Sequence, residues 1–176
     1  MTTDQSIVVR PARTGDVPAI RTLVDTYAPD RRLLGKATVT LYEDIQDFVV
    51  AAAPGGAVVG CGALHVMWDD LAEVRTVAVH PSMLGRGVGR AIGRNLIARA
   101  TSLGVGQLFC LTFEVDFFSR LGFSEIMGTP VSSEVYSEML QSEDEGVAEF
   151  LELERVKPNT LGNTRMLLRL STGDVL

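Results

Sequence analysis

Apolar residues in the first quarter of the chain recur at helical spacing. One such set comprises Val17, Ile20, Leu23, Val24 and Tyr27. This spacing predicts an amphipathic helix, for which Thr14 is a candidate N-cap and Pro18 is tolerated in the first turn. A short strand is expected before it over residues 6–12, and a second short helix, capped by Thr38 or Thr40, is expected after it.

Three continuous apolar runs follow, over residues 48–53, 57–67 and 72–80. Their lengths and their β-branched residues are typical of strands. The first two runs are separated by Pro54-Gly55-Gly56 and the second two by Trp68-Asp69-Asp70, and both connections favour tight turns. We therefore expect an antiparallel meander of three strands.

The third of these strands leads into a turn with glycines at positions 85, 87 and 89, and then into an amphipathic helix. The helix is expected to end near Leu103, with Gly104 in the left-handed conformation that stops it. A further strand is predicted over residues 107–112, because its apolar centre is typical of a buried strand. The succession of strand, helix and strand indicates a parallel pair within an otherwise antiparallel sheet.

The last third of the chain is predicted to contain two more helices and two more strands. A short helix over residues 115–121 is stopped by Gly122, and Phe123 leads into a strand. Residues 131–149 suggest one acidic helix with a solvated outer surface. Its inward positions are Val135, Met139 and Leu140. The chain closes with a strand over residues 163–170, and an exposed final strand would suit a homodimer.

Composition is ordinary for a globular protein and limits the possible partners. The 176 residues suit one domain spanning residues 1–176, of which 46% are hydrophobic and 22% charged. The net charge of −6 argues against nucleic acid as the main partner. Because residues 1–6 are polar and no apolar run approaches about 18 residues, neither a leader nor a membrane span is expected. We therefore expect a cytoplasmic protein.

The thiols and imidazoles give no sign of a metal site. Cys61 and Cys110 each lie within an apolar strand, where buried and reduced thiols are expected. His65 and His80 are not paired with them at ligand spacing, so no metal is predicted. His80 is interpreted as a turn residue before Pro81.

The glycine turn is the candidate ligand site. Residues 73–100 carry five arginines and one acid, whereas residues 134–154 carry eight acids and no Lys or Arg. A P-loop is excluded because no Gly-Lys-Ser/Thr occurs, and a dinucleotide fingerprint would need glycine where Arg90 or Ile92 stands. A glycine-rich turn at a helix N-terminus, followed by arginines along one helix face, predicts a pyrophosphate cradle.

The segment VRTVAVHPSMLGRGVGRAI resembles the acetyl-CoA signature of the GNAT acetyltransferases, which is Gln/Arg-x-x-Gly-x-Gly/Ala after a strand ending in Val-x-Pro. Gly87 and Gly89 take its two small positions, whereas Leu84 stands where Gln or Arg is usual. A second family feature, a helix ending in aromatic-x-x-x-Gly-Phe, starts at Phe118, the position that is often a catalytic tyrosine. The resemblance implies an α/β (α+β) protein with the GNAT fold, whose mixed, mostly antiparallel central sheet is splayed between two parallel strands and flanked by helices.

A narrower resemblance is to the short, stand-alone actinobacterial amino-acid N-acetyltransferases, the N-acetylglutamate synthases. It rests on the segments AEVRTVAVHP, LFCLTFEVDFFSRLGF and VKPNTLGNTRMLLRL, and on the missing tyrosine. It implies transfer of acetyl from acetyl-CoA to the α-amine of L-glutamate, or of L-glutamine, as the first step of arginine biosynthesis. A GNAT enzyme acting on a protein N-terminus or another small amine stays open, as does a non-catalytic acetyl-CoA sensor.

The resemblance also implies roles for individual residues. Acetyl-CoA would contact the strand backbone and the glycine turn, at Val77, Ala78, Val79, Leu84, Gly85, Arg86, Gly87, Val88, Gly89 and Arg90. Glu73 would be the general base, through a water molecule, and Thr112 would orient a water or donate a hydrogen bond to the leaving thiolate. The amino-acid substrate would be bound through its carboxylates, at Lys36, Arg75, Asn163 and Arg165.

Overall fold

The structure is a computed structural model that describes residues 6–30, 33 and 35–171. Residues 1–5, on which the expectation of no leader depends, lie outside these ranges. The strands are β1 Val8–Pro11, β2 Phe48–Ala52, β3 Val58–Trp68, β4 Leu71–Val79, β5 Gln107–Thr112, β6 Ser124–Glu125 and β7 Thr164–Arg169. The α-helices are α1 Val17–Tyr27, α2 Thr38–Glu43, α3 Val88–Leu103, α4 Val115–Arg120, α5 Ser133–Met139, α6 Glu145–Phe150 and α7 Lys157–Thr160.

The strands form one mixed sheet with the order β1-β2-β3-β4-β5-β7-β6. β1 pairs with β2 and β2 with β3 in antiparallel fashion, and β7 is antiparallel to both β5 and β6. β4 and β5 are parallel, with a register from Leu71↔Gln107 to Glu73↔Phe109. This confirms the predicted parallel pair. The final strand lies between β5 and β6, so the expectation that it is an exposed edge is wrong.

Close contacts divide the chain into two compact units. Unit 1 takes in the chain up to Leu64 together with residues 74–99. Unit 2 takes in residues 65–73 and the chain from Ala100 onward. A single domain spanning residues 1–176 stays a prediction.

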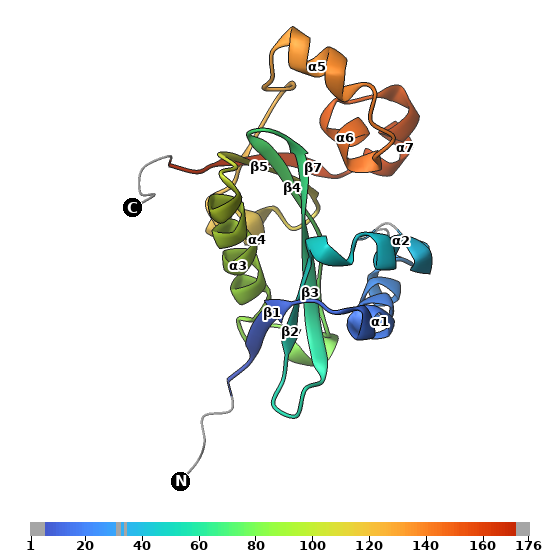
Figure 1. Cartoon of the computed structure of the whole chain (residues 1–176), viewed down its shortest axis with the longest axis vertical. Helices are drawn as coiled ribbons and strands as arrows, with labels where there is room; N and C mark the ends of the chain where they lie inside the picture. Colours follow the sequence, from blue (N-terminus) through green and yellow to red (C-terminus); the bar gives the residue numbers. More distant parts are fainter. Residues whose placement is uncertain (1–5, 31–32, 34, 172–176) are drawn as a thin grey trace. The chain divides into compact units, whose positions relative to one another are not determined.

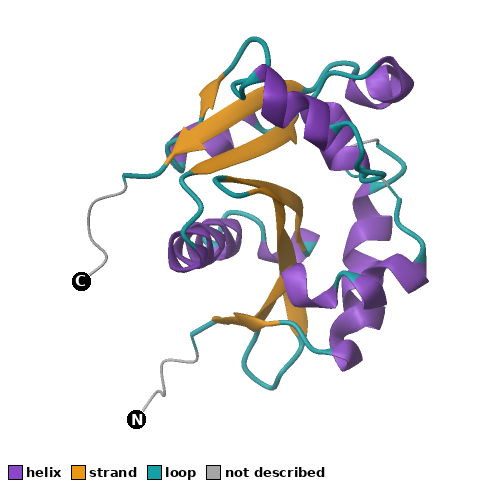
Figure 2. Cartoon of the chain, turned by 45° about the horizontal axis from the view of Figure 1, so that its top comes forward, coloured by secondary structure: helices purple, strands orange, loops and turns teal. Residues whose placement is uncertain are grey.

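In unit 1, helices cover both faces of the strands. Along β2, Phe48 and Val50 join the hydrophobic cluster formed with α1 and α2. Ile92 of α3 approaches Gly60 and Gly62 of β3 from the other face. Figure 1 and Figure 2 both show α3 on one side of these strands and α1 and α2 on the other. The predicted amphipathic helix is confirmed as α1, with its apolar side in this cluster.

The N-caps predicted in this region are wrong. α1 begins at Val17 with Asp16 at its N-cap, because Thr14 instead opens a 3-10 turn that ends at Asp16. The Asp16 carboxylate accepts hydrogen bonds from the backbone N–H of Arg13 and from the guanidinium of Arg10, which fastens β1 to the start of the helix. α2 has Ala37 at its N-cap, so neither Thr38 nor Thr40 caps it.

In unit 2, one hydrophobic cluster joins the strands to the C-terminal helices. Phe109 of β5 and Phe150 of α6 are its largest fully buried members, and their rings meet edge to face with centroids 5.2 Å apart. In Figure 1, α5, α6 and α7 follow one another in orange near the end of the chain. The predicted helix stops are confirmed, since Gly104 and Gly122 have φ of +81° and +100°.

The prediction of a single acidic helix over residues 131–149 is wrong. Two helices form instead, because Ser132 caps α5 by accepting a hydrogen bond from Val135 N–H and Asp144 caps α6 by accepting one from Val147 N–H. Met139 faces inward as predicted, whereas Leu140 is 48% exposed. α6 is buried from Gly146 to Phe150 rather than solvated.

Candidate active site

The glycine turn lies in unit 1 and has the backbone of an anion cradle. Gly85 and Gly87 have φ of +73° and +80°, a conformation that glycine adopts without strain. A Cβ added at either position would meet nothing within 4 Å, so the backbone there is open to a ligand. α3 begins at Val88, and the first N–H groups of a helix have no acceptor within it. Gly89 already lies inside the helix, so two of the three predicted glycines shape the turn.

The side chains around the turn are exposed and largely basic. Arg86 and Arg90 are exposed, as an anion site requires. Leu84 is 59% exposed, although it stands where the resemblance leads one to expect Gln or Arg. Val88 is buried and approaches Gly60 of β3, which anchors the helix start. His80 accepts a hydrogen bond from Ser82 N–H, which confirms its role in the turn.

The strand that leads to this turn contains a kink that the sequence did not predict. Thr76 has φ of +57°, which is rare for a residue other than glycine. Arg75 lies 3.6 Å from Asp44 after α2, and Ala78 packs in the cluster with α1 and α2. Strict alternation would put positions 75 and 78 on opposite faces, so Thr76 has the effect of a β-bulge. The proposed acetyl-CoA contacts at residues 77–79 follow directly after it.

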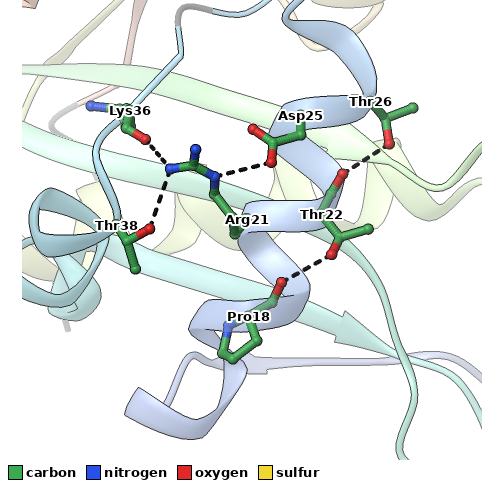
Figure 3. A network of polar contacts seen from close by, with 7 residues as sticks. All are labelled: Pro18, Arg21, Thr22, Asp25, Thr26, Lys36 and Thr38. Carbon is green, nitrogen blue, oxygen red and sulfur yellow. Dashed lines mark hydrogen bonds and ion pairs between the residues drawn. The ribbon is translucent and has the colours of Figure 1, made fainter.

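Lys36 lies in a loop that an arginine of α1 holds in place. Arg21 donates to the backbone carbonyl of Lys36 at 2.5 Å and to Thr38 Oγ1 at 3.3 Å, and it also pairs with Asp25 at 3.0 Å. Figure 3 shows the ammonium end of Lys36 pointing away from this guanidinium. Arg21 was missed by sequence reasoning, because only the folded loop brings the carbonyl to it.

Glu73 lies in unit 2, where it is the last residue of β4 in register with β5. Its side chain is 4% exposed. The carboxylate packs against the backbone of α6, since a Cβ added at Gly146 would lie 2.0 Å from Glu73 Oε2. Burial, followed by the negative charge of Glu73, raises the pKa of the Cys110 thiol. Glu73 is therefore an enclosed carboxylate beside an inert thiol.

Thr112 ends β5 in the same unit and is 8% exposed. Its hydroxyl oxygen accepts a hydrogen bond from Glu114 N–H at 2.8 Å, which leaves the hydroxyl proton free to be donated. Phe118 is buried and packs edge to face against Phe117 and Phe123, so this position supplies hydrocarbon packing and no acid.

The two substrate candidates near β7 have different surroundings. The Arg165 guanidinium donates to the carbonyls of Gly128 and Phe150, both at 2.6 Å, and lies over the Phe109 ring. Burial lowers its pKa, and Glu152, 3.7 Å away, partly offsets this effect. Asn163 is half-buried just before the strand. Register places Thr112 opposite Thr164 and Leu111 opposite Arg165, so these candidates share one end of the β5–β7 pair.

A histidine and an aspartate not assigned a role from the sequence pair at the start of α6. His65 Nε2 is 3.5 Å from Asp144 Oδ2. A Cβ added at Gly146, which would meet Glu73, would also lie 3.1 Å from Asp144 Oδ1. The signal for Asp144 was present in the sequence, because an aspartate that precedes an apolar segment is a candidate N-cap.

The remaining predictions concern the cysteines, metal binding and membrane spans. Cys61 and Cys110 are buried free thiols, as predicted. Over the described residues, no group of three or more His, Cys, Asp or Glu could hold a metal ion. In the same part of the chain, no helix is both long and apolar enough to cross a membrane.

The fold and the glycine turn define an acyl-CoA-dependent transferase of one known class. The profile of the Acetyltransferase (GNAT) family matches residues 18–123, and the chain belongs to this family. The predicted GNAT fold, with its parallel pair in a mostly antiparallel sheet, is confirmed.

The chain is similar to a named relative over nearly its whole length. The amino-acid acetyltransferase of Mycobacterium tuberculosis is 61% identical over 165 residues, which cover 93% of this chain and 94% of the relative. The crystal structure of Mycobacterium tuberculosis Rv2747 in complex with CoA and a second ligand aligns with a TM-score of 0.90, at 61% identity, over 93% of this chain and 99% of that chain.

A more distant structure shares the fold. The N-acetylglutamate synthase of Neisseria gonorrhoeae, solved with coenzyme A and N-acetyl-glutamate, aligns with a TM-score of 0.74 at 21% identity. The alignment covers 96% of this chain and 36% of that chain, so this chain corresponds to one part of the longer protein.

Proposed function

We propose that the chain is an acetyl-CoA-dependent amino-acid N-acetyltransferase that acetylates the α-amine of L-glutamate or L-glutamine. The observation that carries the proposal is the 61% identity to an amino-acid acetyltransferase over 93% of this chain and 94% of the relative. The glycine turn and the buried Glu73 support it, because this chemistry needs an anion cradle for CoA and a base for the amine.

In this account, residues of unit 1 hold acetyl-CoA, which is a substrate. The open backbone at Gly85 and Gly87 and the N-terminus of α3 bind the pyrophosphate, and Arg86 and Arg90 add positive charge. Backbone groups of residues 77–79 bind the pantetheine and polarise the thioester carbonyl. Tyr27 donates a hydrogen bond to the carbonyl of Val79, which fixes the orientation of this backbone. The reaction needs no metal.

The chemical step forms a C–N bond and breaks the C–S bond of the thioester. Glu73 takes a proton from the ammonium of the amino acid, through a water molecule, so that the neutral amine attacks the carbonyl carbon. The attacking nitrogen becomes positively charged and loses a second proton as the C–S bond breaks, and the leaving thiolate gains one proton. Thr112 donates a hydrogen bond to it or orients the water that protonates it, using the hydroxyl proton that the Glu114 contact leaves free.

The carboxylates of the acceptor require cations or amide donors. Arg165 already donates to two backbone carbonyls and is the least suited of the four candidates. Arg75 and Lys36 remain the proposed carboxylate ligands, with Asn163 as an amide donor. Arg75 is steadied by Asp44, and the loop carrying Lys36 is steadied by Arg21.

A role in arginine biosynthesis, a cytoplasmic location and assembly as a homodimer belong to the same proposal. Two buried free thiols suit a reducing compartment. The sequence argument for a dimer does not hold, because β7 lies between β5 and β6 and is not the edge strand of the sheet. Size-exclusion chromatography with light scattering would measure the assembly directly.

The proposal is tested by the release of free CoA from acetyl-CoA over the twenty amino acids, short peptides and small amines. Turnover confined to glutamate or glutamine is the expected result. Turnover with peptides or simple amines alone would replace the proposal by the alternative GNAT activity. Binding of acetyl-CoA without turnover on any acceptor would favour a sensor, since Leu84 and Phe118 depart from the usual catalytic pattern.

A further inference from the structure

α6 is fixed within unit 2 at both of its ends, although its sequence is acidic. At its C-terminal end, Phe150 packs edge to face on Phe109, and the Phe150 carbonyl accepts a hydrogen bond from Arg165 at 2.6 Å. At its N-terminal end, Asp144 accepts a hydrogen bond from Val147 N–H at 3.0 Å and lies 3.5 Å from His65. The helix is therefore held firmly enough to act as a fixed surface for its neighbours.

The neighbour that this surface meets at Gly146 is the carboxylate of Glu73. A Cβ at Gly146 would lie 2.0 Å from Oε2 and 2.9 Å from Cδ of Glu73, and 3.1 Å from Oδ1 of Asp144. Real Cβ contacts are not this short, so any side chain here would displace the carboxylate or the helix. Gly146 has no positive φ, so no backbone requirement explains a glycine at this position.

The geometry points to Gly146 as a positioning residue for Glu73. Because Gly146 has no side chain, the carboxylate of Glu73 packs against the backbone of α6, and α6 fixes its position. The inference rests on the proposed function, in which Glu73 accepts the proton of the acceptor amine. The acidic segment after residue 131 then contributes to the reaction, because contacts of Asp144, His65 and Arg165 fix α6, and α6 positions Glu73. A carboxylate displaced by about 1 Å loses up to roughly 100-fold in rate.

The experiment uses Gly146→Ala with a matched control and a rescue. Gly106→Ala is the control, because its Cβ would lie 2.4 Å from the carboxylate of Asp70, which accepts a hydrogen bond from Gly106 N–H and is not in the proposed machinery. Glu73→Asp is the rescue background, since the shorter side chain withdraws the carboxylate from the added methyl group. For each variant we would measure kcat, the KM for acetyl-CoA and the unfolding temperature.

We expect Gly146→Ala to lower kcat by about tenfold to 100-fold with an unchanged KM for acetyl-CoA. Gly106→Ala should lower the unfolding temperature and keep kcat. In the Glu73→Asp background, Gly146→Ala should cost little further activity or stability. The inference is overturned if Gly146→Ala keeps kcat, if Gly106→Ala lowers kcat equally, or if the loss is the same in both backgrounds.

The two claims fail in different ways. If no amino acid is turned over, the proposed function fails and kcat carries no information about Gly146. The unfolding temperatures of the single and double variants still decide the inference in that case. A double variant that is as stable as Glu73→Asp alone supports the contact, and additive losses overturn it.

Discussion

At the scale of single residues, glycines decide how closely elements approach one another. Gly62 is the clearest case outside the site, because a Cβ there would lie 2.7 Å from Cγ2 of Ile92 and 3.1 Å from Leu96, both on α3. The Cγ2 atom of a β-branched residue is close to the helix backbone and has little room to move. The sequence showed a glycine inside a strand and could not show which helix would lie over it.

We therefore predict that Gly62→Ala destabilises the protein by about 1–3 kcal/mol through overpacking. Chemical denaturation followed by circular dichroism measures this loss. Gly15→Ala is the control, since its Cβ would meet nothing within 4 Å, and we expect a change within about 0.5 kcal/mol. Equal stability of the two variants would show that α3 is not packed this closely on β3.

At the scale of elements, most strands and helices follow from the pattern of apolar residues. β5 was predicted at its observed bounds, because an apolar run that is short and follows a glycine favours a strand over a helix. The region before α6 was predicted wrongly. Residues 140–143 contain neither glycine nor proline, so the apolar pattern gave no sign that the first helix ends there. Only the N-cap at Asp144 marks the start of the second helix.

The Asp16 carboxylate joins β1 to the start of α1, and a pH-dependent contribution to stability is expected there. The hydrogen bond from Arg10, together with one from Arg13 N–H, lowers the pKa of the Asp16 carboxyl below its usual 3.8. A carboxyl whose pKa is lower in the folded state stabilises the fold at pH values above its pKa in the unfolded chain. This contribution is lost as the pH falls through the pKa of the folded state.

We predict that Asp16→Asn loses stability relative to wild type at pH 7 and that this difference shrinks towards about pH 2. Denaturation at a series of pH values measures it. Asp25→Asn, at an exposed pair with Arg21, should show little difference at any pH. A difference for Asp16→Asn that stays constant below pH 3.8 would contradict this assignment.

At the scale of the whole molecule, the sequence predicted the family and the parallel pair, because each depends on a local pattern. It did not predict the enclosure of Glu73, because this depends on where α6 returns after more than seventy residues. The sequence also predicted one domain spanning residues 1–176, and it could not show that the chain forms two compact units.

The two thiols can show whether these units unfold as one domain, because one lies in each unit. Burial raises the pKa of Cys61 to about 12, and it also raises the pKa of Cys110. Neither should react with a thiol reagent at pH 8 until its unit opens. A single domain predicts that both are labelled over the same range of denaturant, as located by mass spectrometry. Labelling of one thiol well before the other would show that the units unfold separately.

If Glu73 is the base of an amino-acid acetyltransferase, Glu73→Gln should remove most of the activity. The amide keeps the size of the side chain and removes its basicity. We expect kcat with glutamate to fall by about 100-fold or more, while the affinity for acetyl-CoA, measured by calorimetry, stays within about twofold. Glu125→Gln, at an exposed position of β6, should change neither quantity. A kcat for Glu73→Gln equal to that of wild type would show that Glu73 is not the base.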